Sequence, residues 1–418
     1  MVPIARQRIL LPKSSWRLAL TGLATGDLWE GEEVEKLEKA FAAAIGVPAA
    51  VAVPSARAGL SFILESMDLE PGAEIICSAF GYPVVPHLVA TRGYTLGFAD
   101  CELETLGMDP QALAKVFEER NPRAVIVTHL YGIPARIREI AEVVKAHDAY
   151  LIEDCAHCFS AAVGGQKTGS FGDYGYFSFE TSKMINTMGG GMLTVRDPEM
   201  AAKIRERARQ EPQRDFGWLA KRLGKTTFEA TVTQPLIFGA GVYPALRLAS
   251  KGTDEDDRFA SGYQADEISM KGRMGRYTNY QARLGLRQIE ALESLVERRV
   301  ANAERLIGQL SDRVHFQQPV GPDTRADYML VTALFPRMPE MAQLLLQRGV
   351  DTKHQYMRDC ADLLEGAGDF PNAVRAEREV LHLPAYPQLS PEQIDRVAEQ
   401  VKDALDALGA QGADSGTS

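Results

Sequence analysis

The sequence lacks long apolar runs, and none reaches the ~18 residues that a membrane-spanning helix needs. Its opening residues, MVPIARQRILLPKSSW, carry positive charge but no apolar signal-peptide region, so we expect a cytoplasmic protein. The chain also lacks an excess of basic residues, because 46 lysines and arginines stand against 56 acidic residues, for a net charge of −10. That balance argues against nucleic acid as a partner, since a phosphate backbone attracts cationic surfaces.

Cysteine is scarce and odd in number, with five residues scattered through 418. Such a distribution does not predict a disulfide framework. Cys155 and Cys158 form a C-x-x-C pair, but no further ligands follow at the close spacing that a zinc site requires. We therefore predict no metal site and expect the pair to pack in the interior. A redox or metal-binding role for the pair is the alternative.

The sequence does contain a regular alternation of β-prone runs and amphipathic helices over roughly residues 15–250. Leu37, Phe41 and Ile45 stand at helical spacing, and Ser55 has a side chain suited to a helix N-cap. The β-prone runs are Ala49–Val53, Glu74–Cys77, Thr95–Phe98, Ala124–Thr128 and Ala149–Ile152. Strands alternating with helices predict an α/β large domain with a mainly parallel sheet flanked by helices.

The C-terminal part of the sequence predicts a smaller α+β domain. Its expected elements are a helix from Tyr277 to about Leu310, a strand over Asp327–Phe335, and helices over Glu340–Arg348 and Ser390–Leu408. We predict a large domain over 1–270, a small domain over 271–408, and a disordered tail over 409–418. The tail is predicted to be disordered because it is rich in glycine, alanine and serine.

Residues 150–193 contain an acid, a serine and a lysine in the order that suits a pyridoxal 5'-phosphate (PLP) site. Asp154 falls where a buried strand should end, and Ser178 lies one short turn before Lys183. PLP chemistry needs a lysine for attachment, an acid that keeps the pyridine nitrogen protonated, and donors for the phosphate. A lysine buried against a cofactor loses its proton readily. The triglycine at 189–191 allows backbone to pass close to a ligand.

The same segment resembles the PLP-dependent sugar aminotransferases of the DegT/DnrJ/EryC1/StrS family, which have fold type I of the aspartate aminotransferase superfamily. The matching pieces are E-D-C-A-H at 153–157, G-S-F-G-D at 169–173, F-S-F at 177–179, Lys183, and the glycines at 189–191. H-L-Y-G at 129–132, D-F-P-N-A at 369–373 and L-P-A-Y-P at 383–387 extend the likeness to nearly the whole chain. The resemblance implies a seven-stranded-type sheet in the large domain, bound PLP and a homodimer.

The resemblance also implies roles for the residues around the PLP ring. Lys183 would carry the cofactor and move a proton between substrate and cofactor, and Asp154 would bind the pyridine nitrogen. His157 would lie near the phenolic oxygen, and Tyr82 would stack on the ring. These residues are the predicted catalytic pair, Lys183 and Asp154, and two of the predicted cofactor ligands.

The predicted phosphate ligands are Ser178 and the helix start at Ala56 and Arg57, where backbone N–H groups would face the phosphate. Arg57 replaces a family threonine, and it either grips the phosphate or points to solvent. Met274 replaces an asparagine that in relatives can reach the neighbouring subunit's phosphate. Met188-Gly189 replaces the family's Gly-Glu.

Segment 205–265 makes the chain about 45 residues longer than the family pattern, which is more than an ordinary loop. It begins with basic residues, continues with the apolar run Thr231–Ala249, and ends with acidic residues. We expect this insert to serve as a lid or a subunit interface. Contact with a membrane surface through 212–250 and a mostly mobile loop are the alternatives.

Together the residues and the resemblance predict an aminotransferase that moves an amino group from glutamate or glutamine to a keto-sugar linked to a nucleotide. One alternative acceptor is a cyclitol, or a hydrophobic or lipid-linked ketone, which the apolar insert and the altered Gly-Glu and asparagine positions favour. Another alternative is a non-catalytic PLP-binding or regulatory protein, which the altered phosphate turn favours. Lys183, Asp154 and Ser178 weigh against that reading, because a lapsed site has no need of them.

Overall fold

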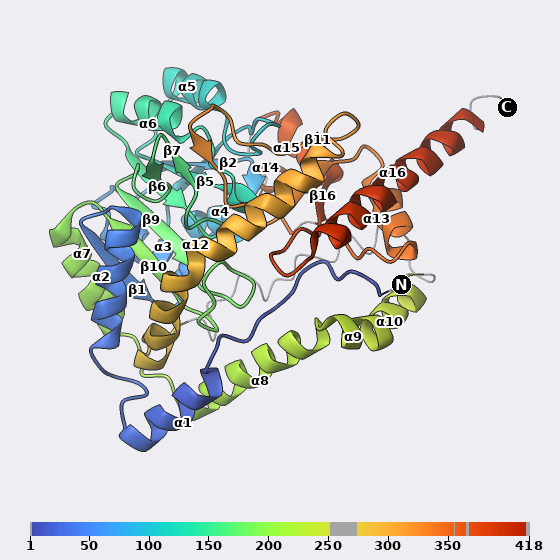
Figure 1. Cartoon of the computed structure of the whole chain (residues 1–418). Helices are drawn as coiled ribbons and strands as arrows, with labels where there is room; N and C mark the ends of the chain where they lie inside the picture. The colour runs from blue at the N-terminus through green and yellow to red at the C-terminus, as the bar shows by residue number, and fades with distance from the viewer. Residues whose placement is uncertain (1, 251–273, 355, 365–367, 415–418) are drawn as a thin grey trace.

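A computed structural model describes residues 2–250, 274–354, 356–364 and 368–414 (Figure 1). Its centre is a seven-stranded sheet in the order β1-β10-β9-β6-β5-β2-β4. The strands are β1 (Ala49–Val53), β2 (Glu74–Ser78), β4 (Thr95–Ala99), β5 (Ala124–Thr128), β6 (Tyr150–Asp154), β9 (Tyr174–Ser178) and β10 (Gly191–Val195). Because β10 pairs antiparallel with both of its neighbours and the other pairs are parallel, β10 alone runs against the other six. The predicted α/β fold with a mainly parallel sheet is confirmed.

Helices cover both faces of this sheet, which explains why its strands are apolar throughout rather than alternating. On β1, Val51 and Val53 face one layer of helices, whereas Ala50 and Ala52 face the other. The first layer contains α3 (Ala56–Ser66), α4 (Val84–Thr91) and α7 (Pro198–Arg209). The second contains α2 (Glu33–Ile45), α5 (Pro110–Glu119), α6 (Ile137–Ala146) and the first half of α12 (Asn279–Gly308).

The C-terminal residues build a second, four-stranded sheet in the order β11-β13-β16-β14. Its strands are β11 (His315–Phe316), β13 (Val331–Leu334), β14 (Lys353–His354) and β16 (Val380–Leu383). Its helices are α13 (Met338–Gln347), α14 (Cys360–Leu363), α15 (Pro371–Glu379) and α16 (Pro391–Asp414). The predicted strand at 327–335 forms only in its second half, because Asp327 instead accepts hydrogen bonds from the backbone of Phe159 and Ser160.

Small β elements connect the two units. They are β3 (Phe80–Gly81), which pairs with β15 (Arg358–Asp359), and β7 (Ala162–Val163), which pairs with β8 (Gln166–Lys167) and β12 (Thr324–Arg325). A 3₁₀ turn, η1, spans Leu130–Gly132. The N-terminal segment, which we assigned to the large domain, is buried with the C-terminal unit: Ile4 bridges Val350 and shares its core cluster.

The tail prediction is wrong for residues 409–414. Helix α16 continues to Asp414 and includes Gly409 and Gly412, so these glycines do not end the helix. Residues 415–418 lie outside the described residues. In the part of the chain that the structure describes, no helix is long and apolar enough to cross a membrane.

From Phe216 to Ala249 the insert is mainly helical, so the alternative of a mostly mobile loop is wrong for these residues. It contains α8 (Phe216–Val232), α9 (Pro235–Ile237), the π-helix η2 (Phe238–Val242) and α10 (Tyr243–Ala249); residues 251–273 lie outside the described ranges. The insert also starts later than predicted. Arg205 and Arg207 belong to α7, where Arg205 pairs with Glu38 and Arg207 pairs with Glu65 and Glu211.

Candidate active site

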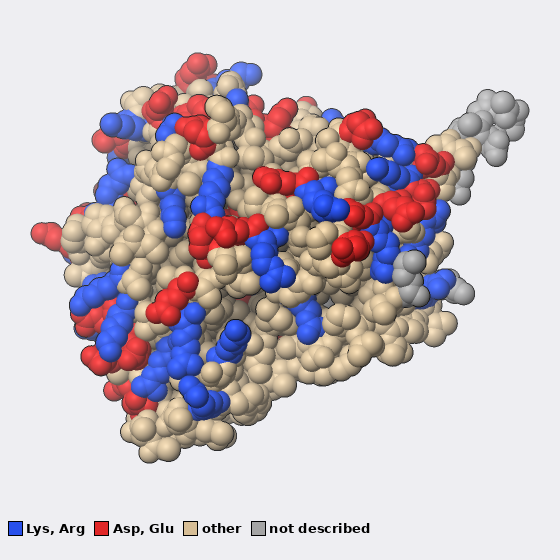
Figure 2. Space-filling view, in the orientation of Figure 1, with Lys and Arg blue, Asp and Glu red and all other residues tan. Residues whose placement is uncertain are grey.

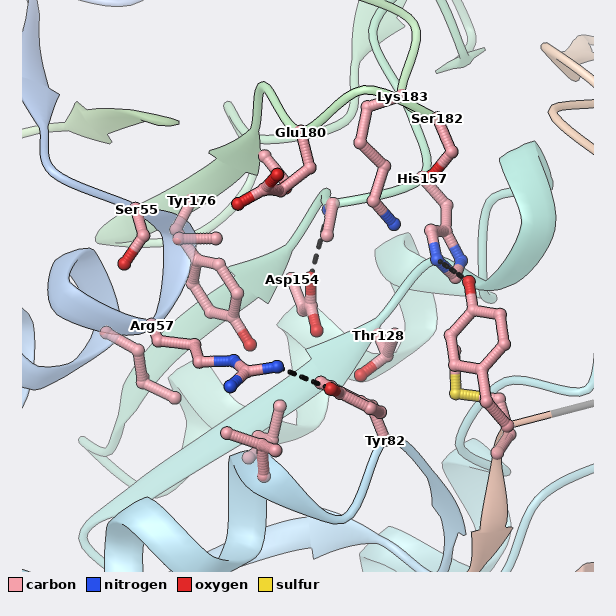
Figure 3. A pocket seen from close by; sticks show the side chains of 18 of the residues that line it. Ser55, Arg57, Tyr82, Thr128, Asp154, His157, Tyr176, Glu180, Ser182 and Lys183 are labelled. Carbon is pink, nitrogen blue, oxygen red and sulfur yellow. Dashed lines mark hydrogen bonds between the residues drawn. The ribbon is translucent and has the colours of Figure 1, made fainter. Parts of the chain in front are cut away.

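A cavity of 290 Å³ opens at the carboxyl ends of β5, β6 and β9, beside the N-terminus of α3 (Figure 3). Ligands of parallel α/β sheets commonly bind at this end of the strands. Every residue predicted for the cofactor lines this cavity: Ala56, Arg57, Tyr82, Asp154, His157, Ser178 and Lys183. The structure therefore brings together residues that are spread over more than a hundred positions of sequence.

Lys183 lies in the loop between β9 and β10, and its amine reaches into the cavity near Asp154 and His157 (Figure 3). A turn holds the loop, because the Lys183 backbone N–H donates to the carbonyl of Glu180 at 3.0 Å. Burial lowers the pKa of Lys183 to about 8, although Asp154 and Glu180 favour the charged amine. A lysine of this kind exchanges its proton near neutral pH.

Asp154 ends β6 and is 4% exposed. Its carboxylate accepts a hydrogen bond from the Ala156 backbone N–H at 2.9 Å (Figure 3). Burial nevertheless raises the pKa of Asp154, against the opposing effect of Lys183. A cation beside such a carboxylate stabilises its ionised form.

His157 is held in one tautomer by two hydrogen bonds. Its Nδ1 accepts from the Tyr131 backbone N–H at 3.1 Å, so Nε2 carries the proton and donates it to the Tyr356 hydroxyl at 2.9 Å (Figure 3). Burial lowers the pKa of His157 well below its ordinary value, and Lys183 adds to the effect. The ring is therefore neutral at physiological pH and presents an N–H group at the cavity.

The N-terminus of α3 faces the cavity from the opposite side. Ser55 caps the helix, since its hydroxyl accepts from the Ala58 backbone N–H at 3.1 Å. Arg57 points into the cavity rather than to solvent, and its guanidinium donates to the hydroxyl of Tyr82 (Figure 3). The same guanidinium lies 5.4 Å from the centre of the Tyr82 ring.

The three glycines at 189–191 are needed for a different purpose from the close approach to a ligand that we predicted. A Cβ on Gly191 would stand 2.4 Å from the Phe177 carbonyl, and a Cβ on Gly190 would stand 2.3 Å from the Tyr277 ring. These glycines allow close packing of protein against protein rather than of backbone against a ligand. Met188 just before them has φ 62°, a region that glycine adopts readily. The family glycine at this position suits that backbone better than methionine does.

Sequence reasoning missed several residues that line the cavity. Among them are Thr128, Tyr176, Glu180, Ser182, Lys353, Tyr356 and Met357. Lys353 is the most telling, because burial and repulsion by Lys183 lower its pKa to about 7. It comes from β14 of the C-terminal sheet, and nothing in its local sequence indicates that it lies near Lys183.

A second cavity of 660 Å³ meets the first at Ser182 and Lys183. It lies between the N-terminal segment 6–14, α12 and the C-terminal unit. Among the residues that the structure describes, six cationic side chains and one acid, Glu290, line it; the cations are Arg6, Arg8, Lys13, Lys183, Arg287 and Arg299. Two of these side chains, both half-buried, have a buried nitrogen without a hydrogen-bond partner among the described residues: Arg8 Nη1 and Arg299 Nε.

The C-x-x-C pair belongs to the interior, as expected. Cys155 and Cys158 are buried free thiols, and burial raises the pKa of both. His129, Glu153 and Cys155 come close enough to hold a metal ion, but the Glu153 carboxylate already accepts from the backbone N–H groups of residues 169, 171 and 172. His129 Nε2 also lies 3.0 Å from Glu153 Oε2, and together these contacts give Glu153 a structural role.

Comparison with known proteins places this geometry in a family. Residues 17–402 match the DegT/DnrJ/EryC1/StrS aminotransferase family. The spore coat polysaccharide biosynthesis protein SpsC of Bacillus subtilis (strain 168) is 28% identical over 405 residues, which is 92% of each chain. The dTDP-4-dehydro-2,3,6-trideoxy-D-glucose 4-aminotransferase of Saccharopolyspora spinosa is 24% identical and covers 90% of each chain.

A solved structure extends the likeness to three dimensions. The aminotransferase TlmJ of Streptoalloteichus hindustanus superimposes with a TM-score of 0.75 at 26% identity, covering 97% of this chain and all of that one. The family match spans nearly the whole chain and includes every residue that lines the small cavity. The chain therefore belongs to the DegT/DnrJ/EryC1/StrS family and is a PLP-dependent aminotransferase.

Proposed function

We propose that this enzyme moves an amino group from glutamate or glutamine to a keto-sugar carried on a nucleotide, and that it acts as a homodimer. The observation that carries the proposal is the position of Lys183, at the junction of a small cavity and a larger, cationic one. The relative from Saccharopolyspora spinosa, whose name describes a nucleotide-linked keto-sugar as its substrate, supports the acceptor class.

The small cavity fits PLP by the chemistry of its donors. The buried carboxylate of Asp154, whose pKa is raised by burial, suits the protonated ring nitrogen. Ser178, Arg57 and the backbone N–H groups of the α3 N-terminus suit the phosphate. Tyr82 would lie against the ring, and His157 would lie near its phenolic oxygen, where the N–H that donates to the Tyr356 hydroxyl would be shared between the two acceptors.

When bound, PLP supplies an electron sink for charge that develops on the carbon next to the transferred nitrogen. The residues of this chain then control protons and position. With a pKa of about 8, the Lys183 amine can take a proton from that carbon and return it. Asp154 stays ionised beside a cation, and the neutral His157 holds its donor in place through Tyr131 and Tyr356.

The larger cavity suits the nucleotide part of the acceptor. Its volume lies within the range typical of small-molecule sites, and its lining is strongly cationic. Arg299 carries this argument, because its Nη1 donates to the sulfur of Met184 and its Nε has no hydrogen-bond partner among the described residues. Burial lowers the pKa of Arg299 to about 10, so an anion such as a diphosphate would be favoured there.

The first experiment tests the amino-donor half of the proposal. PLP is added to the purified protein, and its visible absorbance is recorded before and after L-glutamate, L-glutamine or L-alanine. We expect a change with glutamate or glutamine and none with the Lys183→Ala variant. An unchanged spectrum with both donors would contradict the donor assignment.

The second experiment tests the acceptor. Steady-state kinetics compare nucleoside-diphosphate keto-sugars with the free keto-sugars, with a cyclitol ketone and with a lipid-linked keto-sugar. Arg299→Met should raise KM for the nucleotide-linked acceptor by about 10- to 100-fold, the value of one or two charged hydrogen bonds, and leave KM for the donor unchanged. Arg375→Met, at an exposed pair with Glu379, is the control. Equal use of free and nucleotide-linked sugars would refute the acceptor class.

Sedimentation equilibrium tests the homodimer.

A further inference from the structure

The exposed apolar side chains of this protein gather on one part of its surface. Ten large hydrophobic residues are exposed in the described ranges, and all of them lie between residues 2 and 23 or in the insert. Eight belong to helices α1 (Ser15–Thr25) and α8–α10, which we call the apolar ridge: Trp16, Leu20, Leu23, Phe216, Phe228, Leu236, Ile237 and Leu248. Isolated exposed leucines are ordinary, but a cluster of this size on one face is not.

The two longer helices of the ridge turn apolar residues outward by their spacing. On α1, Trp16, Leu20 and Leu23 stand at i, i+4 and i+7, while Leu18 and Ala19 face the protein. On α8, Leu219 and Leu223 are buried, whereas Phe216 and Phe228 are 58% and 66% exposed. Figure 1 shows α1 and α8–α10 along the lower edge, and Figure 2 shows that edge as a band almost free of charged side chains.

The charges that the ridge does carry are basic. Residues 15–25 and 216–249 contain Arg17, Lys221, Arg222, Lys225 and Arg247 but only one acid, Glu229, in a chain whose net charge is −10. Glu229 is itself bound to Lys225, at 3.7 Å. Apolar residues flanked by lysine and arginine are the pattern of helices that lie in the interface of an anionic bilayer.

We propose that the apolar ridge docks on the surface of an anionic membrane. A second copy of this chain is a poorer partner, because a two-fold interface would place one ridge against the same charge on the other, a net +3 when Arg222, which pairs with Glu180, is left out. Anionic headgroups complement that charge, and the acyl region accepts the leucine and phenylalanine side chains. Trp16, 49% exposed, suits the boundary between the two.

Docking would also orient the active site toward the membrane. The segment 6–14 that lines the larger cavity leads directly into α1. Arg222 of α8 reaches back to the Lys183 loop, where its Nη1 lies 3.1 Å from Glu180 Oε2. A membrane-borne acceptor would therefore approach the cationic cavity from the ridge side. Docking itself does not depend on which acceptor is used.

The test is co-sedimentation of the full chain with vesicles of phosphatidylcholine alone or mixed with phosphatidylglycerol. We expect binding to the anionic vesicles only, release by added salt, and a shift of tryptophan emission to shorter wavelength on binding. Leu20→Ser/Phe228→Ser/Leu236→Ser should weaken partitioning by about 100-fold, because three apolar side chains no longer insert. Lys221→Gln/Lys225→Gln should weaken it by about 30-fold.

The matched control is Lys115→Gln/Lys145→Gln, at exposed lysines of α5 and α6 outside the ridge, which should bind vesicles as the unaltered protein does. Absence of binding to anionic vesicles overturns the proposal. So does binding that survives the serine substitutions. A change in oligomeric state caused by the serine substitutions, without vesicle binding by the unaltered protein, would assign the ridge to contact between copies. Because no substrate is present, these outcomes are independent of the acceptor assay.

Discussion

The lysine at the centre of the site should destabilise the protein that surrounds it. Burial lowers the pKa of Lys183 from 10.5 to about 8 in the folded chain. Between these values the unfolded chain binds a proton that the folded chain does not, so the contribution of Lys183 to stability rises with pH through this window. Below pH 8 both states are protonated, and the full cost of roughly 3 kcal/mol is present.

Replacing Lys183 with methionine, which has a similar volume and no charge, should remove this cost. We expect Lys183→Met to raise the free energy of unfolding of the PLP-free protein by about 2–3 kcal/mol at pH 7, while abolishing transamination. The gain should shrink as the pH rises from 8 toward 10.5, because the unfolded lysine then loses its proton as well. Urea unfolding of both proteins, stripped of PLP, measures the difference at each pH.

The control is Lys115→Met, at an exposed position of α5, which should change stability by less than about 0.5 kcal/mol at any pH. Comparing two proteins at the same pH cancels the titration of all other groups. A Lys183→Met variant that is less stable than the unaltered protein at pH 7 would refute the reasoning. So would a gain that does not depend on pH.

Three further predictions concern residues that support or line the small cavity. Glu153→Ala leaves two buried and one half-buried backbone N–H group without an acceptor and should lower the free energy of unfolding by about 4 kcal/mol or more, measured by urea unfolding. Asp109→Ala, at an exposed helix cap, is a milder comparison. Gly190 has φ 94°, and Gly190→Ala would place a Cβ against the Tyr277 ring, so this variant should have a lower melting temperature. Gly224→Ala, with open space around the added Cβ, should leave the melting temperature unchanged. Asp154→Asn should weaken PLP binding measured by absorbance titration; unchanged affinity would contradict its proposed contact.

The chemistry of the small cavity could be predicted because its signals are local. Asp154, Ser178 and Lys183 follow or end β-prone runs, and Ser55 precedes a helical pattern with the side chain of a cap. The carboxyl ends of adjacent parallel strands meet at one edge, so residues after such strands converge. The role of the triglycine was misjudged, because packing against Tyr277 and Phe177 cannot be seen from the glycines themselves.

The rest of the site could not be predicted, because it depends on which distant segments meet. Lys353 and Tyr356 come from the C-terminal unit, and Arg299 from the middle of a long helix whose periodicity shows only its buried stripe. The insert posed a similar problem. Its composition was compatible with a lid, a mobile loop or a membrane contact. Only the burial of Leu219 and Leu223 in the folded chain shows which face of α8 is exposed to solvent.

The sequence by itself determined the alternation of strands and helices, the family, and the acid, serine and lysine of the cofactor cavity. These follow from periodicity and from short motifs, which act over a few residues. Tertiary structure alone decided the cationic cavity beside Lys183, the lowered pKa of Lys353 and the arrangement of the apolar ridge. Burial and the field of neighbouring charges are properties of segments brought together by folding, so no single stretch of sequence contains them.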